Sequence, residues 1–315
     1  IKDLINQGHE VYALAPDFDE YTKEQVKNLG AMPTDFKLDR NGMNPVIDLQ
    51  NTIHLFFLLK RIKPDIVISY AVKTIIYGSI ASAFAKIPTR VAMVEGLGFI
   101  FTKTKKKENL KHTILEKIVS YLLKVSLNLC HEIIFLNKDD KSELIKKKII
   151  KNQKGFVLGA IGLDLKYWQS TKPVINPITF VFVGRILREK GIIEYLKAAS
   201  FIKKRYPKVT FLVLGRVDTN PTSLTNYEIQ KWVNKKVIEW PGHVDTRKWV
   251  SKSSVFVLPS YREGFPRSSQ EAMALAKPII TTNVPGCKET VINGKNGFII
   301  EPKNTDELIK KIIFF

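Results

Sequence analysis

The chain has 315 residues, of which 44% are apolar, so it is long enough to bury the cores of two domains of ordinary size. This composition excludes a disordered or low-complexity protein. Fifty Lys and Arg residues against thirty Asp and Glu residues give a formal net charge of +20, which suits a partner that carries phosphate or an anionic surface.

Cysteine usage and hydropathy narrow the class of protein further. Cys130 and Cys287 are too few and too far apart for a disulfide framework, which favours a reducing compartment, and they form no metal site. Lysines interrupt apolar runs such as HLFFLLKRIK before the roughly 18–20 residues that a membrane span needs, so we expect no spanning helix. The chain opens on Ile1 and ends within an apparent helix, and we expect a fragment that lacks parts of both ends.

The first half of the chain alternates between helical and strand patterns. Helical spacing predicts helices over residues 1–8, 74–87 and about 109–129, the first ending at Gly8. Short apolar runs predict strands over 9–17, 64–71, 89–96 and 130–137, and a strand is expected before the first helix. Such alternation is typical of stacked βαβ units with a parallel sheet.

The second half repeats the alternation after a polar, proline-bearing linker over residues 166–177. Strands are expected over 178–185, 208–216, 236–243, 253–260 and 277–283, with helices between most of them. We therefore expect an α/β protein of two Rossmann-like, doubly wound parallel-sheet domains, 1–172 and 173–315, that face each other across a cleft. Ligands of such sheets bind outside the carboxyl ends of the strands.

A loop rich in cations follows the first strand of the second half. In FVGRILREKG, Gly184 allows a ligand close to the backbone, and Arg185 and Lys190 precede a helix, as suits a diphosphate. The alternative is a set of solvated basic residues in a loop.

Two carboxylates lie on either side of a Gly-Phe-Pro turn in the segment YREGFPRSSQEAMALAKP, which follows the strand expected over residues 253–260. Glu263 is expected on the loop and Glu271 in the following helix, with Pro266 in its first turn. Free amides at the helix start suit an anion, and the carboxylates can accept hydrogen bonds from hydroxyl groups, so a phosphate-bearing, polyhydroxylated ligand fits both features. The alternatives are a capping role for Glu263 and a solvated position for Glu271.

The segments FVGRILREKG, PGHVDT and VFVLPSYREGFPRSSQEAMALAKPIITTNVPGCKETVINGKNGFII resemble the nucleotide-sugar half of the family four glycosyltransferases, over about residues 178–305. The resemblance implies the GT-B fold and a retaining enzyme that needs no metal and no cofactor, with a UDP-sugar as substrate. TRVAMVEGLGFIFT and VPGC are most similar to bacterial enzymes that add an N-acetylhexosamine to an undecaprenyl-diphosphate-linked sugar.

The resemblance also implies roles for individual residues. Arg185 and Lys190 would bind the donor diphosphate and neutralise the leaving group, Glu271 would hold the ribose hydroxyls, and Glu263 would face the transferred sugar. The backbone at His243 and Val244 would frame the base. The complete set of expected donor-binding residues is Gly184, Arg185, Lys190, His243, Val244, Glu263, Gly264, Phe265, Pro266, Arg267 and Glu271.

Glu95 departs from the family pattern, in which a His commonly faces the sugar at this position. A carboxylate there suits binding of a sugar hydroxyl, orientation of the acceptor or stabilisation of positive character at the anomeric carbon, so we count Glu95 among the catalytic candidates. The alternative is a structural or helix-capping glutamate.

An acidic turn near the N-terminus offers two further hypotheses. Asp17-Phe18-Asp19 has the form of a metal-binding DxD sequence, but an ordinary turn is the favoured interpretation. Asp17 also stands where an NAD site would place its ribose-binding acid, an interpretation that leaves the second half of the chain unexplained.

Residues 103–154 carry fourteen lysines and six acidic residues. Lys103, Lys105, Lys106, Lys107 and Lys111 form an expected membrane or acceptor surface. The helix that follows has an apolar stripe of Leu110, Ile114, Ile118, Leu122 and Val125. The alternative is a core-facing stripe with a solvated lysine face. We expect an enzyme in the cytoplasm, peripheral on the inner face of the cytoplasmic membrane.

The sequence thus predicts a transferase for bacterial surface polysaccharide or oligosaccharide synthesis, with a UDP-sugar donor and a lipid-linked or glycan acceptor. One alternative is an enzyme like the UDP-N-acetylglucosamine 2-epimerases, which share the fold but lack a Gly-Phe-Pro turn between paired glutamates. Another is a basic nucleic-acid-binding protein, but TKTKKKENLK carries no aromatic residue that could stack on bases, so no nucleic-acid partner is expected.

Overall fold

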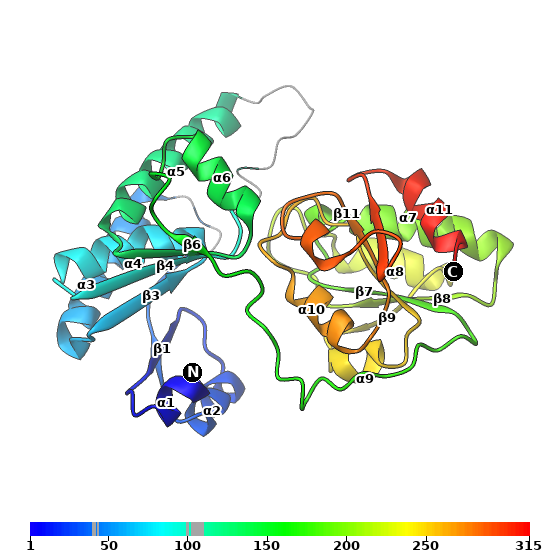
Figure 1. Ribbon diagram of the computed structural model, residues 1–315, viewed down its shortest axis with the longest axis horizontal. Coiled ribbons are helices and arrows are strands. Elements are labelled where there is room, and N and C mark those ends of the chain that lie inside the picture. The colour runs from blue at the N-terminus through cyan, green and yellow to red at the C-terminus, as the bar shows by residue number, and fades with distance from the viewer. Residues whose placement is uncertain (40–41, 43, 99–100, 102–109) are drawn as a thin grey trace. The chain divides into compact units, whose positions relative to one another are not determined.

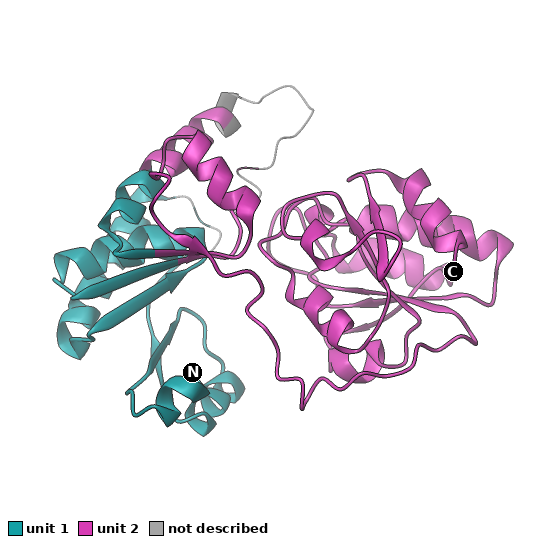
Figure 2. Ribbon diagram, in the orientation of Figure 1, with its two compact units in different colours: residues 1–92, 122–132 teal, residues 93–121, 133–315 magenta. Residues whose placement is uncertain are grey.

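The computed structural model describes residues 1–39, 42, 44–98, 101 and 110–315, of which residues 110–112 by backbone alone. The chain forms two compact units, one of residues 1–92 with 122–132 and one of residues 93–121 with 133–315 (Figure 2). The domain boundary expected between residues 172 and 173 stays a prediction.

Helices and strands alternate along the first half of the chain (Figure 1). In chain order they are α1 (Lys2–Asn6), β1 (Tyr12–Ala15), α2 (Glu20–Asn28), β2 (Met32–Asp35), α3 (Pro45–Ile62), β3 (Ile66–Tyr70), α4 (Val72–Phe84), β4 (Thr89–Val94), α5 (Leu110–Leu129), β5 (Glu132–Phe135), α6 (Lys138–Lys146) and β6 (Phe156–Val157). The helices and strands expected in this half correspond to α1, α4, α5, β1, β3, β4 and β5.

Two strands of this half are absent from the sequence-based expectations. β2 reads Met-Pro-Thr-Asp, with a proline and a single large apolar residue, and β6 has two residues, so neither shows a strand pattern. Parallel pairing with a neighbour creates both: β2 lies beside β1, and β6 beside β5. β1 and β2 form a two-stranded sheet, and the order β3-β4-β5-β6 forms a four-stranded one.

The second half forms a longer series of elements. They are β7 (Thr179–Val183), the 3₁₀ turn η2 (Arg188–Lys190), α7 (Ile192–Arg205), β8 (Thr210–Leu214), α8 (Asn226–Asn234), β9 (Glu239–Gly242), α9 (Thr246–Val250), β10 (Val255–Leu258), α10 (Arg267–Ala274), β11 (Ile279–Thr282), the 3₁₀ turn η3 (Lys288–Thr290), β12 (Gly297–Ile300) and α11 (Thr305–Ile313). All five expected strands form, and β12 adds a sixth.

The six strands form one sheet in the order β12-β11-β10-β7-β8-β9, with parallel pairing throughout. The strand order reverses between β7 and β10, which are hydrogen-bonded neighbours. Because parallel strands end at the same edge of a sheet, the loops that follow β7 and β10 leave side by side. Such a reversal point is where ligands of doubly wound sheets bind.

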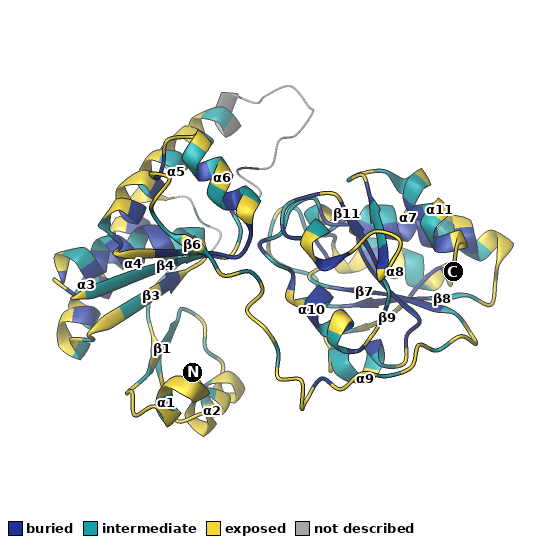
Figure 3. Ribbon diagram, viewed as in Figure 1, coloured by how far each residue is buried: buried dark blue, intermediate teal, exposed yellow. Residues whose placement is uncertain are grey.

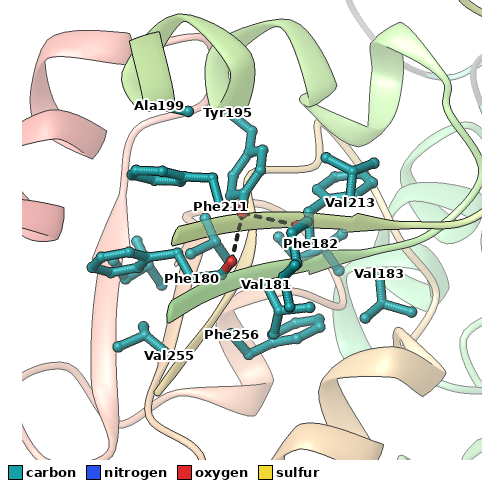
Figure 4. Packing of buried hydrophobic residues seen from close by; sticks show 14 of the residues in the cluster. Phe180, Val181, Phe182, Val183, Tyr195, Ala199, Phe211, Val213, Val255 and Phe256 are labelled. Atoms are coloured by element: carbon teal, nitrogen blue, oxygen red, sulfur yellow. Dashed lines mark hydrogen bonds between the residues drawn. The ribbon is translucent and has the colours of Figure 1, made fainter. Parts of the chain in front are cut away.

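The core of the second half surrounds this sheet. Every residue of β7, β10 and β11 is buried, as expected of parallel strands that helices cover on both faces (Figure 3). In the close view, the rings of Phe180 and Phe211 stack with centroids 5.3 Å apart, and Tyr195 of α7 packs against Phe182 (Figure 4). Trp168, in the expected linker, is also buried in this core.

Candidate functional site

Glu263 and Lys190, both expected at one site, are in direct contact. The Lys190 Nζ donates to both carboxylate oxygens of Glu263, at 2.6 and 2.8 Å, and the Ser260 hydroxyl donates to Oε1 at 2.8 Å. The Glu263 side chain is 11% exposed and that of Lys190 is 21% exposed. The loops after β10 and β7 therefore bring a largely buried carboxylate and a half-buried ammonium group to one point.

The turn that carries Lys190 is shaped by Gly191. Gly191 has φ +74° and begins α7, and a Cβ at this position would lie 2.1 Å from the backbone oxygen of Pro259. Only glycine fits there without displacing the neighbouring loop. The Tyr261 amide donates to the Glu189 carbonyl oxygen at 2.8 Å, which fastens the two loops together on the same side.

Glu271 lies in α10, as predicted, and Pro266 is the residue that caps this helix. The Arg267 Nε donates to Glu271 Oε1 at 3.2 Å, and the Thr246 hydroxyl donates to Oε2 at 3.3 Å. Burial raises the pKa of Glu271, and Arg267 and Thr246 offset part of that rise. Thr246 was not among the expected site residues, because its contact with Glu271 depends on how α9 packs beside α10 and not on any local sequence pattern.

Arg185 is an exposed side chain paired with a carboxylate. Its Nη1 donates to Asp218 Oδ2 at 3.1 Å, and the Arg185 side chain is 56% exposed. Although burial alone would raise it, the pKa of Asp218 is lowered, because the Asn220 amide and Arg185 both favour its charged form. Asp218 follows β8 at the same edge of the sheet, and no sequence motif marks it.

The remaining expected donor residues border this edge of the sheet. His243 is exposed and Val244 half-buried, both between β9 and α9, while Phe265 is half-buried beside the Glu263 loop. Gly184 lies directly after β7, and its carbonyl oxygen would be 1.9 Å from a Cβ on Gly215. The binding roles of these residues stay predictions.

Glu95 follows β4 and lies against the Glu263 loop. A Cβ on Gly264 would lie 1.8 Å from the Glu95 backbone oxygen, so a glycine is needed where the two segments cross. Glu95 is exposed, yet the protein atoms around its carboxyl group remove part of the water there, and this desolvation raises the pKa of Glu95. Glu95 thus joins the catalytic candidates Arg185, Lys190 and Glu263 from a segment about 170 residues earlier than Gly264 in the sequence.

The acidic turn of the first half has a local structural role. The Asp19 carboxylate accepts a hydrogen bond from the Thr22 amide at 2.7 Å and caps α2. Within the described residues, no group of three His, Cys, Asp or Glu side chains is arranged to hold a metal ion. The capping contact of Asp19 is what an ordinary acidic turn would make, and a metal-binding role for the DxD-like sequence is not tested.

The expected basic surface is described only in part. Lys103, Lys105, Lys106 and Lys107 lie outside the described residues, as does the side chain of Lys111. Among the helices that the structure describes, none is both long enough and apolar enough to cross a membrane.

Both halves of the chain match known protein families. Residues 1–135 match the family described as "Glycosyl transferase 4-like", and residues 168–315 match "Glycosyl transferases group 1". A Campylobacter jejuni enzyme, N,N'-diacetylbacillosaminyl-diphospho-undecaprenol alpha-1,3-N-acetylgalactosaminyltransferase, is 30% identical over 99% of this chain and 83% of its own length. An Escherichia coli UDP-Gal:alpha-D-GlcNAc-diphosphoundecaprenol alpha-1,3-galactosyltransferase is 29% identical over 84% of this chain and 70% of its own.

Solved structures show the same fold. Anabaena HepE in complex with UDP has a TM-score of 0.70 at 17% identity, over 96% of this chain and 81% of HepE. Sucrose-phosphate synthase from Thermosynechococcus elongatus has a TM-score of 0.74 at 16% identity, over 97% of this chain and 89% of its own. Each half of the chain matches a glycosyltransferase family, and a 30% identical relative is matched over most of its length. The chain therefore belongs to the glycosyltransferases, with a 4-like first half and a group 1 second half, and has their GT-B fold.

Proposed function

We propose that the enzyme is a retaining, metal-independent transferase that moves an N-acetylhexosamine from a UDP-sugar to an undecaprenyl-diphosphate-linked sugar or glycan in bacterial surface polysaccharide synthesis. The observation that carries this proposal is the contact of Lys190 with Glu263 where the loops after β7 and β10 meet. The relatives support the substrates, since the C. jejuni and E. coli enzymes have diphosphoundecaprenol-linked acceptors and HepE was solved with UDP.

In this reaction the negative charge grows on the departing UDP. The bond between the anomeric carbon and the β-phosphate oxygen breaks, and a bond to the acceptor hydroxyl oxygen forms on the same face of the sugar. The hydroxyl proton passes to the departing diphosphate, the nearest group that gains negative charge. Arg185 and Lys190 stabilise that charge, and preorganised cations of this kind contribute much of the rate enhancement in enzymes.

The two glutamates divide the donor between them. Glu263 accepts hydrogen bonds from hydroxyls of the transferred sugar, next to the backbone of Gly264 and Phe265. Glu271 accepts those of the ribose, and the backbone at His243 and Val244 frames the base. Binding through the nucleotide holds the sugar in reacting geometry.

The acceptor side belongs to residues 1–172 and the donor side to residues 173–315 in this proposal. Glu95 takes part in the reaction as a carboxylate near the transferred sugar and the Glu263 loop. The closeness of its backbone to Gly264 supports this placement.

A membrane-bound acceptor calls for an enzyme at the cytoplasmic face of the membrane. The solvent side of α5 carries large apolar side chains together with lysines, and the exposed ones are Ile114, Lys117, Ile118, Tyr121, Lys124 and Val125. Of the predicted apolar stripe, Ile114, Ile118 and Val125 are thus exposed and support a surface role, whereas Leu122 is half-buried. A helix face that mixes apolar and cationic groups suits the interface of an anionic bilayer, together with Lys103, Lys105, Lys106, Lys107 and Lys111.

The test is transfer of radiolabelled sugar from UDP-GlcNAc, UDP-GalNAc, UDP-glucose and UDP-galactose to a bacterial lipid extract. We expect label in the lipid phase with one of the N-acetylhexosamine donors. Lys190→Met should lower this transfer by about 100-fold or more, because a cation that stabilises developing charge is lost. Arg188→Met, in the same turn but paired with Glu228 at 3.2 Å, is the matched control and should transfer at the wild-type rate.

Other outcomes would contradict the proposal in different ways. Conversion of the donor sugar to another configuration, without label in lipid, would favour the epimerase alternative. No consumption of any donor would show that the assignment of the site is wrong.

A further inference from the structure

Arg262, directly before Glu263, is bound to a distant helix. Its guanidinium group contacts the carboxylates of Asp140 and Glu143 of α6, the latter at 2.7 Å. A third hydrogen bond runs from Nη1 to the Phe101 carbonyl oxygen at 3.2 Å. The Arg262 side chain is 9% exposed and that of Asp140 is fully buried, so this is a buried ion pair and not a surface contact.

Asn137 binds the residue on the other side of Glu263. Its Nδ2 donates to the Gly264 carbonyl oxygen at 2.7 Å and to Asp140 Oδ2 at 2.8 Å, while its Oδ1 accepts from the Asp140 amide at 2.7 Å. Asn137 is fully buried and caps α6. One end of one helix therefore holds the residues immediately before and after Glu263.

A third segment supports Glu263 itself. The Glu263 amide donates to the Pro285 carbonyl oxygen at 3.1 Å. A Cβ on Gly286 would lie 2.5 Å from the backbone oxygens of Glu263 and Gly264, so this segment packs closely on the loop. With its backbone held in these ways, Glu263 presents its carboxylate to Lys190.

The energetics of such a pair favour a geometric role. Removing an arginine and a carboxylate from water costs free energy that their attraction barely repays, so an apolar pair of similar volume would stabilise the fold equally well. The ion pair instead fixes the orientation of the loop that carries Arg262, because the donors of a planar guanidinium group allow few arrangements of their partners.

We propose that Arg262, held by Asp140 and Glu143, is a positioning residue. Together with Asn137, which binds the Gly264 carbonyl oxygen, it places the Glu263 carboxylate and the Gly264 backbone where they meet the donor sugar. This inference rests on the proposed function. By this proposal α6, whose Asp140 is 122 residues from Arg262 in sequence, controls how the enzyme holds the sugar. It does not affect how the enzyme holds the UDP.

The experiment compares two affinities and one rate. Calorimetry gives the Kd for UDP and for the UDP-sugar that the transfer assay selects, and the assay gives kcat. In Arg262→Met and in Asp140→Asn we expect the Kd for UDP to stay within about twofold of wild type, and kcat to fall about 10- to 100-fold because the sugar is misplaced. The difference in affinity between UDP-sugar and UDP should shrink in the same variants.

Two further variants separate positioning from stability. Lys288→Met removes an ion pair of 2.8 Å to Asp139 of the same helix, without touching Arg262, and should keep wild-type kcat. Arg262→Lys keeps the charge but not the fork of donors, and should recover part of kcat. If Arg262→Met does not fold, Glu143→Gln tests the same contact at its half-exposed end, with a smaller loss of kcat expected.

The outcomes distinguish this inference from the proposed function. A wild-type protein that binds no UDP-sugar and transfers nothing would overturn the proposed function and this inference with it. A wild-type protein that transfers sugar, with Arg262→Met or its substitute Glu143→Gln retaining full kcat and full preference for the UDP-sugar, would overturn the positioning role alone.

Discussion

Each charged side chain expected to hold the donor already has a partner of opposite charge. Lys190 is paired with Glu263 and Arg185 with Asp218, while Arg267 lies beside Glu271. A nucleotide diphosphate that enters the site has to exchange these contacts for its own. Before binding, these pairs avoid the cost of an isolated charge in a half-buried site. After binding, hydrogen bonds from hydroxyl groups of the donor have to replace the cation beside Glu263.

Glu271 provides a test at this scale. Its pKa is raised by burial above the ordinary 4.5, and only the ionised carboxylate accepts hydrogen bonds with both oxygens. Protonation increases as the pH falls, so UDP affinity should decline while the pH is still above 4.5. Glu271→Gln should weaken UDP binding at neutral pH by about tenfold or more and remove this part of the pH dependence, as calorimetry at several pH values can measure.

Glu263→Gln is the control for that prediction. It should not weaken UDP binding, because it releases Lys190 from its carboxylate partner, and it should keep the wild-type pH dependence. Affinity should fall only for the UDP-sugar. Equal losses of affinity for bare UDP in both variants would contradict the division of roles between the two glutamates.

Among the elements, α5 shows how a helix can combine two surfaces. Leu123 and Leu127 are buried, whereas Ile118 and Tyr121, on the other side, are more than half exposed. Exposed apolar residues on a helix that also carries lysines are costly in water but favourable at a lipid interface.

Replacing Lys117 and Lys124 with Gln should weaken binding to vesicles of anionic lipid by about 30-fold, because each lysine near such a surface contributes about 1 kcal/mol. UDP affinity should not change. Cosedimentation with anionic and zwitterionic vesicles measures the effect, and Lys204→Gln with Lys208→Gln, an equal loss of charge at exposed positions, is the control. Equal losses in both double variants would show that net charge, and not this helix, determines binding.

For the molecule as a whole, the six-stranded sheet, whose strands β7, β10 and β11 are buried throughout, supports the site. Its strands end where the Lys190 and Glu263 loops begin, so a well-packed sheet keeps those loops in place. Tyr195 joins helix and sheet at the centre of this core, with its hydroxyl 2.9 Å from the Phe180 carbonyl oxygen and 3.0 Å from that of Leu212 (Figure 4).

Tyr195→Phe should lower the free energy of unfolding by about 1 kcal/mol, since a buried hydrogen bond is lost and two carbonyl oxygens remain. Denaturant unfolding followed by fluorescence measures this change. Because the substitution keeps the ring and lies away from the loops, UDP affinity should equal that of wild type. A loss of UDP affinity without a loss of stability would contradict the prediction, because it would show that Tyr195 affects the site and not the stability of the core.

Much of the fold could be predicted from local patterns. Five strands of the second half, the helix with Glu271 and the turn with Lys190 follow from apolar periodicity and from glycine and proline positions, each within about ten residues of sequence. β2 and β6 could not be predicted, because their short, weakly apolar segments become strands only by pairing with β1 and β5.

The sequence by itself determined the types of the elements with clear periodicity and which of them carry chemically useful side chains, because helical and strand periodicity, turns and caps are local properties of a chain. Only the tertiary structure decided that Lys190 meets Glu263, 73 residues later, and that Arg262 binds Asp140. Those contacts depend on the order of parallel strands and on how segments far apart in sequence pack together, and neither is written in any local pattern.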